Sequence, residues 1–119
     1  MTVFENLTPH PLNIKTADGG FVTIPPSFRG PARVVYDTLP PEQVSYGGLA
    51  TFEVTVASRP REIIGLPDPD EEDEPLIFIV AKAVADAAPS WREDLMSPGR
   101  LIRDADGTVI GCDGLTRRA

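Results

Sequence analysis

The sequence contains little cysteine, little histidine and no long hydrophobic stretch. Cys112 is the single cysteine among 119 residues, which excludes a disulfide within the chain and favours a reducing compartment. His10 is the single histidine, so a zinc site of the usual type would need carboxylates or a second subunit, and we predict no metal and no other cofactor. The longest run of large apolar residues, 76–80, is far shorter than the ~20 residues that cross a bilayer, so no membrane helix is expected.

Positive charge and catalytic signatures are also scarce. The formal net charge of −7 argues against a nucleic acid partner, because a phosphate backbone needs a basic surface. Residues 1–6 lack the basic region and apolar core of a secretory signal, so we expect a cytoplasmic protein. The patterns G-x-x-x-x-G-K, H-E-x-x-H, C-x-x-C and G-x-S-x-G are missing, which favours a non-catalytic protein over an enzyme.

The most informative stretch that is present lies at residues 76–88. Its first part, 76–80, is rich in β-branched residues and is typical of a central strand buried on both faces. Its second part, 81–88, is rich in alanine and predicts a helix that ends before Pro89. A buried strand that leads into one helix is therefore the predicted centre of the fold.

Thirteen prolines and ten glycines divide the rest of the chain into short segments, as in strand-rich proteins. Two hairpins are predicted, 12–14 with 21–24 and 101–103 with 108–111, each around an Asp-Gly turn. Further strands are expected at 32–36, 51–56 and 62–66, with one helical turn at 41–44. We therefore predict a single α+β domain over 1–119, a mainly antiparallel sheet with one helix.

Two polar segments stand apart from this pattern. Residues 68–74 carry six carboxylates, which repel one another and predict an exposed acidic loop. The loop lacks the glycine and spacing of a calcium loop, although carboxylates can bind hard cations. Residues 116–119 form a predicted polar tail.

The first candidate site is a row of polar residues near the N-terminus. Asn6, Thr8 and His10 lie on one side of the chain if this segment is extended, and together they could bind a small anionic ligand. The alternative is that Asn6 and Thr8 bond to nearby backbone and shape a loop, as these residue types often do. The prolines that flank His10 favour this second interpretation.

The second candidate site lies in the C-terminal half. Ser97 and Gly99 belong to a predicted tight turn at 97–99, and Arg92 and Arg103 flank it in the sequence. Backbone amides at a turn can hold an anion together with an arginine. The alternative is that these arginines pair with surface carboxylates.

Several segments resemble a family of small uncharacterised proteins of bacteria and their phages. The resemblance covers most of the chain outside the acidic loop and the tail, and its motifs are N-L-T-P-H at 6–10, S-P-G at 97–99 and R-D-x-D-G-x-V-I-G-C at 103–112. It implies a bacterial or phage setting and no particular activity.

Three functions follow as hypotheses. The first is a non-catalytic binding module for a small anionic, nucleotide-like ligand or for a protein, such as an inhibited host protein. The second is a small nucleotide or ester hydrolase that uses His10 as a base. Cys112 could act as its nucleophile, but a buried inert thiol is the commoner state of such a cysteine. The third is an interaction protein that docks through its acidic loop. Exposed strand edges also favour self-association.

Overall fold

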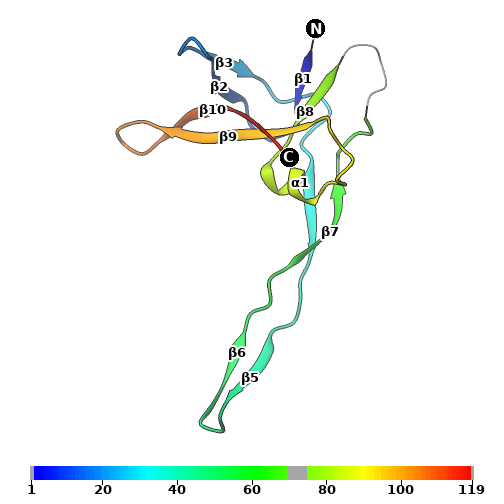
Figure 1. The fold of residues 1–119 in the computed structure, drawn as a ribbon, viewed down its shortest axis with the longest axis vertical. Coiled ribbons are helices and arrows are strands. Elements are labelled where there is room, and N and C mark those ends of the chain that lie inside the picture. Colours follow the sequence, from blue (N-terminus) through cyan, green and yellow to red (C-terminus); the bar gives the residue numbers. More distant parts are fainter. Residues whose placement is uncertain (1, 70–74, 119) are drawn as a thin grey trace.

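The main body of the protein is a six-stranded sheet. The structure is a computed structural model that describes residues 2–69 and 75–118. The strands of the sheet lie side by side in the order β1 (Val3–Asn6), β8 (Leu76–Ile79), β9 (Leu95–Arg103), β10 (Val109–Arg117), β2 (Leu12–Lys15) and β3 (Phe21–Ile24) (Figure 1). The predicted acidic loop falls largely on residues 70–74, outside the described part of the chain.

The sheet is mixed, so the prediction of a mainly antiparallel sheet was wrong. β8 pairs in parallel with β1 and with β9, and β10 pairs in parallel with β2. Only the β9–β10 and β2–β3 pairs of this sheet are antiparallel, and each is a hairpin. Parallel neighbours need a crossover connection, and the helix α1 (Lys82–Ala87) supplies one between β8 and β9.

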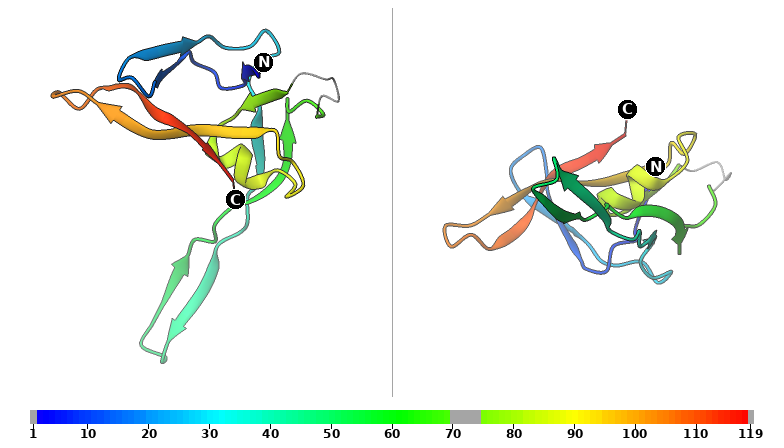
Figure 2. Two further views of the ribbon diagram at one scale, coloured as in Figure 1. Left: turned by 45° about the horizontal axis from the view of Figure 1, so that its top comes forward. Right: turned by 90° about the horizontal axis from the view of Figure 1, so that it is seen from below.

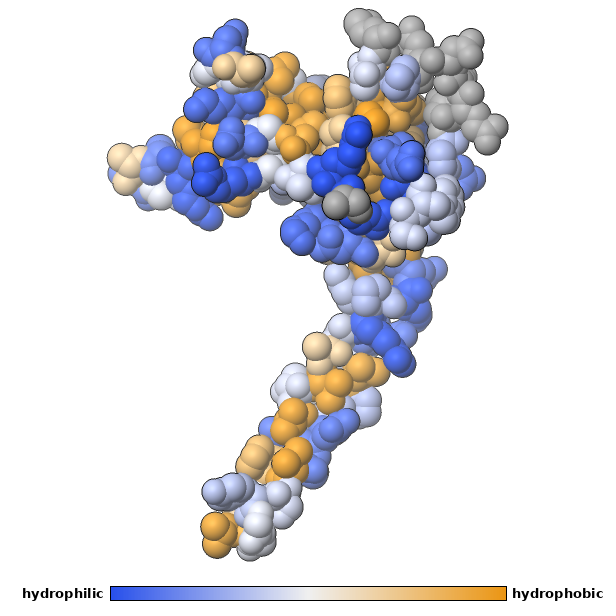
Figure 3. Space-filling view, in the orientation of Figure 1, coloured by the Kyte–Doolittle hydropathy of each residue, from blue (hydrophilic) through white to orange (hydrophobic). Residues whose placement is uncertain are grey.

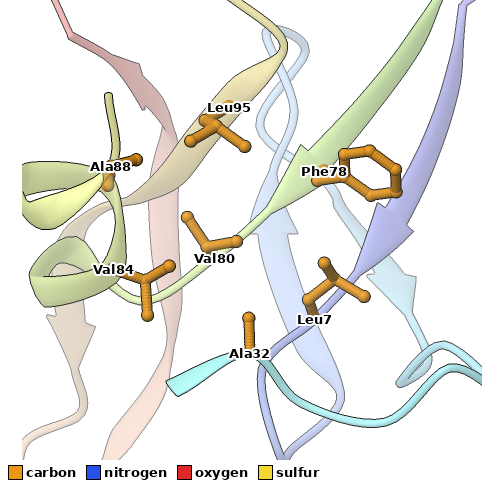
Figure 4. Close-up of a cluster of buried hydrophobic side chains, with 8 residues drawn as sticks. Leu7, Ala32, Phe78, Val80, Val84, Ala88 and Leu95 are labelled. Atoms are coloured by element: carbon orange, nitrogen blue, oxygen red, sulfur yellow. The ribbon is translucent and has the colours of Figure 1, made fainter. Parts of the chain in front are cut away.

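The predicted centre of the fold is confirmed. β8 is buried along most of its length, and α1 matches the helix expected at 81–88. Phe78 and Val80 pack with Leu7, Val84 and Leu95 on the side of the sheet that carries α1 (Figure 4). Ile79 points to the other side, where it packs with Ile14 and Cys112. The strand therefore joins two hydrophobic clusters.

The C-terminal segment is part of this body. Thr116 and Arg117 pair with β9, so the predicted polar tail extends the sheet. The Arg118 guanidinium donates hydrogen bonds to the carbonyls of Ala85 at 2.6 Å and Ala88 at 2.9 Å. These carbonyls lie at the C-terminal end of α1, where a positive charge is favourable.

Two local predictions were wrong. The turn expected at 97–99 is a continuous part of β9, where Ser97 pairs with Thr116 and Pro98 with Leu115. Gly99 is required by close packing, because a Cβ there would lie 2.5 Å from the carbonyl oxygen of Asp113. The helical turn expected at 41–44 is a strand, since a hairpin partner pairs with it along its length.

A long hairpin leaves the body below α1. Its near part is the pair β4 (Arg33–Asp37) and β7 (Arg59–Ile64), and its far part is the pair β5 (Glu42–Tyr46) and β6 (Ala50–Val54). The far part projects away from the body in Figure 1 and in the left view of Figure 2. The molecule measures 64 × 42 × 26 Å as a result.

Candidate functional site

The far part of the hairpin, residues 42–54, is the most unusual feature of the structure, and we call it the arm. Its strands join at Gly47 and Gly48, whose φ angles are +54° and +77°. A tight hairpin turn of this kind requires positive φ at both central residues, which glycine adopts without strain. The Leu49 amide closes the turn with a hydrogen bond of 2.8 Å to the Tyr46 carbonyl.

The arm has one apolar face and one polar face. Residues that pair across the strands share a face, and the register sets Val44 opposite Phe52 and Tyr46 opposite Ala50. Val54, opposite Glu42, lies on this same apolar face because side chains alternate along a strand. The other face carries only polar side chains: Gln43, Ser45, Thr51 and Glu53.

All ten strand residues of the arm are exposed. Tyr46 is 67% exposed, Phe52 is 52% exposed and Leu49, at the tip, is 82% exposed. Figure 3 shows hydrophobic residues, in orange, along much of the arm and again at its tip. An alternating hairpin normally turns its apolar face to a core, and this one faces water.

A second apolar surface lies on the body, where β2 meets the β9–β10 hairpin. It is a groove of about 440 Å³, which we call the groove. Its lining is mainly apolar and consists of Pro11, Leu12, Asn13, Pro98, Leu101, Val109, Ile110, Gly111 and Cys112. Leu101, Val109 and Ile110 are each more than 40% exposed, so the groove is open to a partner.

Asn6 and Thr8 serve the backbone of their own loop. The Asn6 side-chain amide donates to the carbonyls of His10 at 2.8 Å and Ile24 at 3.1 Å. Its oxygen accepts hydrogen bonds from the Thr8 amide at 2.9 Å and the Thr8 hydroxyl at 2.6 Å. These four bonds use the full capacity of an Asn side chain. Both residues are also buried, and their side chains bond to the loop itself, as the alternative interpretation of this segment expects.

His10 lies at the surface of the same loop. Its side chain is exposed, and the bonds with Asn6 and Thr8 involve its backbone carbonyl. The groove begins one residue later, at Pro11. The N-terminal segment and the C-terminal hairpin therefore do meet in one concavity, but the surfaces that meet are apolar.

The remaining predicted site residues are not gathered into one place. Arg92 is buried, and its guanidinium donates two hydrogen bonds to the Asp94 carboxylate, at 2.8 and 2.9 Å. Arg103 lies at the other end of β9, where it donates to the Gly107 carbonyl at 2.9 Å. The nine-residue strand separates the two by roughly 26 Å. Ser97 and Gly99 lie within it, where Ser97 pairs with Thr116 of β10 and Gly99 allows the close approach of the Asp113 carbonyl.

Arg92 instead borders a polar concavity of about 390 Å³, which we call the arginine hollow. Its lining is Ser90, Arg92, Glu93, Leu95, Arg117 and Arg118. Two of its three guanidinium groups already serve the fold: Arg92 also donates to the Pro67 carbonyl, and Arg118 holds the end of α1. Arg117 is exposed at its edge.

Within 2–69 and 75–118, no group of three or more His, Cys, Asp or Glu side chains is placed to hold a metal ion. The helix in this part of the chain is far too short to cross a bilayer.

Sequence reasoning predicted one strand of the arm, at 51–56 where the structure has β6, but it missed the partner strand β5 and the groove. The signal for the arm was nonetheless present, because apolar residues alternate at 44 and 46 and again at 52 and 54, on either side of Gly47-Gly48. Pro41 obscured it, since proline is also common at the first position of a helix. The groove has no comparable local signal, because its walls come from segments about 90 residues apart.

Comparisons with protein-family models, with curated proteins and with solved structures found no match to this chain.

Proposed function

We propose that this chain is a non-catalytic binding module of a bacterial or phage setting, and that it binds a protein through the apolar face of the arm. The observation that carries this proposal is the alternation of apolar and polar residues over 43–54 of the arm together with the exposure of all its strand residues. Alternation is useful to a hairpin only when one face is covered. Here the cover has to come from another polypeptide.

Energetics support a covered state. A two-stranded hairpin by itself is marginally stable in water. The exposed parts of the apolar side chains on the arm amount to about 400 Å². Burial at ~25 cal/mol per Å² would contribute about 10 kcal/mol before the losses of association are subtracted. A protein surface is the partner that suits a flat strip of this size.

The other hypotheses have less support from the geometry. A hydrolase that uses His10 needs a carboxylate to orient the imidazole and a nucleophile within reach. Cys112, the nucleophile considered above, is buried and its thiol contacts the Gly114 carbonyl at 3.4 Å. Docking through the acidic loop concerns residues largely outside the described chain and is tested by deleting 70–74.

A small anionic ligand remains a second candidate, and the arginine hollow is the feature that favours it. Three guanidinium groups border one concavity in a chain whose formal net charge is −7. Arg117 is the group best placed to serve a ligand, since Arg92 and Arg118 bond to the fold. Nucleotides should then raise the melting temperature of the wild type and leave that of Arg117→Ala unchanged.

Site-specific photo-crosslinking in cells tests protein binding through the arm. A photoreactive side chain at position 52 should give covalent protein adducts, because this position lies in the middle of the apolar face. The same side chain at position 51 is the control, since it lies on the polar face of the same strand. Equal yields at the two positions, or no adduct at either, would contradict the proposed function.

A further inference from the structure

We infer that the protein which covers the arm is a second copy of this chain, with each arm lying in the groove of the other copy. This inference rests on the proposed function and names its partner. The arm is a convex apolar strip and the groove a concave apolar surface, and one chain carries both. The arm and the β9–β10 hairpin point in different directions, which gives the molecule an L shape (Figure 1). Two copies of this shape can therefore each place the arm against the groove of the other.

Charge supports the same pairing. The apolar face of the arm carries one charged residue, the acidic Glu42, which pairs with Val54. β9, which forms one wall of the groove, carries the basic Arg103. Arg103 lies two residues after Leu101 and therefore on the same face of the strand.

The surface area buried between two copies distinguishes a reciprocal pair from a single contact. One arm in one groove could bury at most about 800 Å² in total, which is the size of a crystal-packing contact. Two arms packed face to face have the same upper bound. Two arms in two grooves could bury up to roughly 1,600 Å², the standard size of a specific interface. A twofold symmetric pair forms both contacts at once, as most homodimers do.

The first experiment measures molecular mass in solution across a concentration series. The wild type should change from 12.8 kDa to twice that mass as concentration rises, with a Kd in the micromolar range or tighter. Phe52→Glu and Leu101→Glu should each raise the Kd by at least about 30-fold, because each places a charge in the apolar contact. Thr51→Glu, on the polar face of the arm, should dimerise like the wild type.

Mixing the two variants tests which surfaces meet. Phe52→Glu retains an intact groove and Leu101→Glu an intact arm, so their mixture should form a heterodimer through one remaining contact. This heterodimer should be weaker than the wild-type dimer and stronger than either variant alone. If Leu101→Glu alone dimerises normally, the arms pack on each other and the role of the groove is overturned.

Two outcomes separate this inference from the proposed function. A wild type that is monomeric at every concentration, or that forms larger assemblies, overturns the reciprocal pair. The proposed function then still stands if the adduct at position 52 contains a different protein. An adduct of two chains of this protein at position 52, with none at 51, supports both.

Discussion

The body and the arm use the same sequence pattern with opposite results. β2 in the body and β6 in the arm both alternate apolar with polar residues. In β2 the inward residue Ile14 is buried against Ile79 and Cys112, whereas in β6 the equivalent Phe52 is 52% exposed. The pattern thus specifies which face is to be covered, and the tertiary structure decides whether the cover lies in the same chain. In the arm it does not.

The same substitution in the two regions should have very different effects. Phe78→Ala removes a ring that is 1% exposed and should lower the free energy of unfolding by about 3–5 kcal/mol. Phe52→Ala should change it by less than ~0.5 kcal/mol in the monomer and weaken association instead. Chemical denaturation at low protein concentration measures both values. Equal losses would show that the arm is part of the core.

Ion pairs extend the comparison. Arg92→Ala should lower the free energy of unfolding by about 3 kcal/mol, because it leaves the largely buried Asp94 carboxylate without its partner. Arg61, at the base of the arm, makes exposed contacts with Asp37 and Glu62 at 3.8 and 3.4 Å. Arg61→Ala should therefore cost less than ~1 kcal/mol. Thermal denaturation of the two variants provides the test, and a larger loss for Arg61→Ala would contradict the account.

Buried and exposed amides offer a smaller contrast. Asn6→Ala removes four hydrogen bonds and leaves the buried Thr8 amide without its Asn6 acceptor and the Ile24 carbonyl without its Asn6 donor, so a loss of about 2 kcal/mol is expected. Gln43→Ala removes an exposed amide from the polar face of the arm and should be neutral within ~0.5 kcal/mol. If Asn6→Ala also proves neutral, the loop does not depend on this side chain.

The smallest expected effect concerns one carboxyl at a hairpin turn. A hydrogen bond from the Thr16 hydroxyl, followed by one from the Gly20 amide, lowers the pKa of Asp18 below its ordinary value. A lowered pKa gives stability that is present at neutral pH and lost as pH falls through the folded value. In Thr16→Ala the pKa of Asp18 should rise, which carbon-detected NMR titration measures. An unchanged pKa would show that the Gly20 amide suffices.

Local signals predicted the elements whose residues all favour one state. The helix at Lys82–Ala87 follows from a run of alanines, and the β2–β3 and β9–β10 hairpins follow from Asp-Gly turns. The parallel pairing of β8 with β1 was not predicted, because the two strands are some 70 residues apart and nothing local specifies it.

The errors come from residues whose local meaning is ambiguous. Pro98 and Gly99 were interpreted as a turn, but the glycine serves the close approach of β10. Asn6 and Thr8 were expected on one side of an extended segment, whereas the chain bends at 8–10. The pattern alone could not say whether their polar atoms serve a ligand or the backbone. β5 was missed because Pro41 was interpreted as a helix start, although the other strand of the arm was predicted.

The most direct test is amide hydrogen exchange of the arm as a function of protein concentration. The account predicts that the β5 and β6 amides exchange rapidly in dilute protein and become protected as concentration rises, while β8 stays protected throughout. Arm amides that exchange at the same rate at every concentration, whether fast or slow, would contradict a partner copy as the cover of the arm.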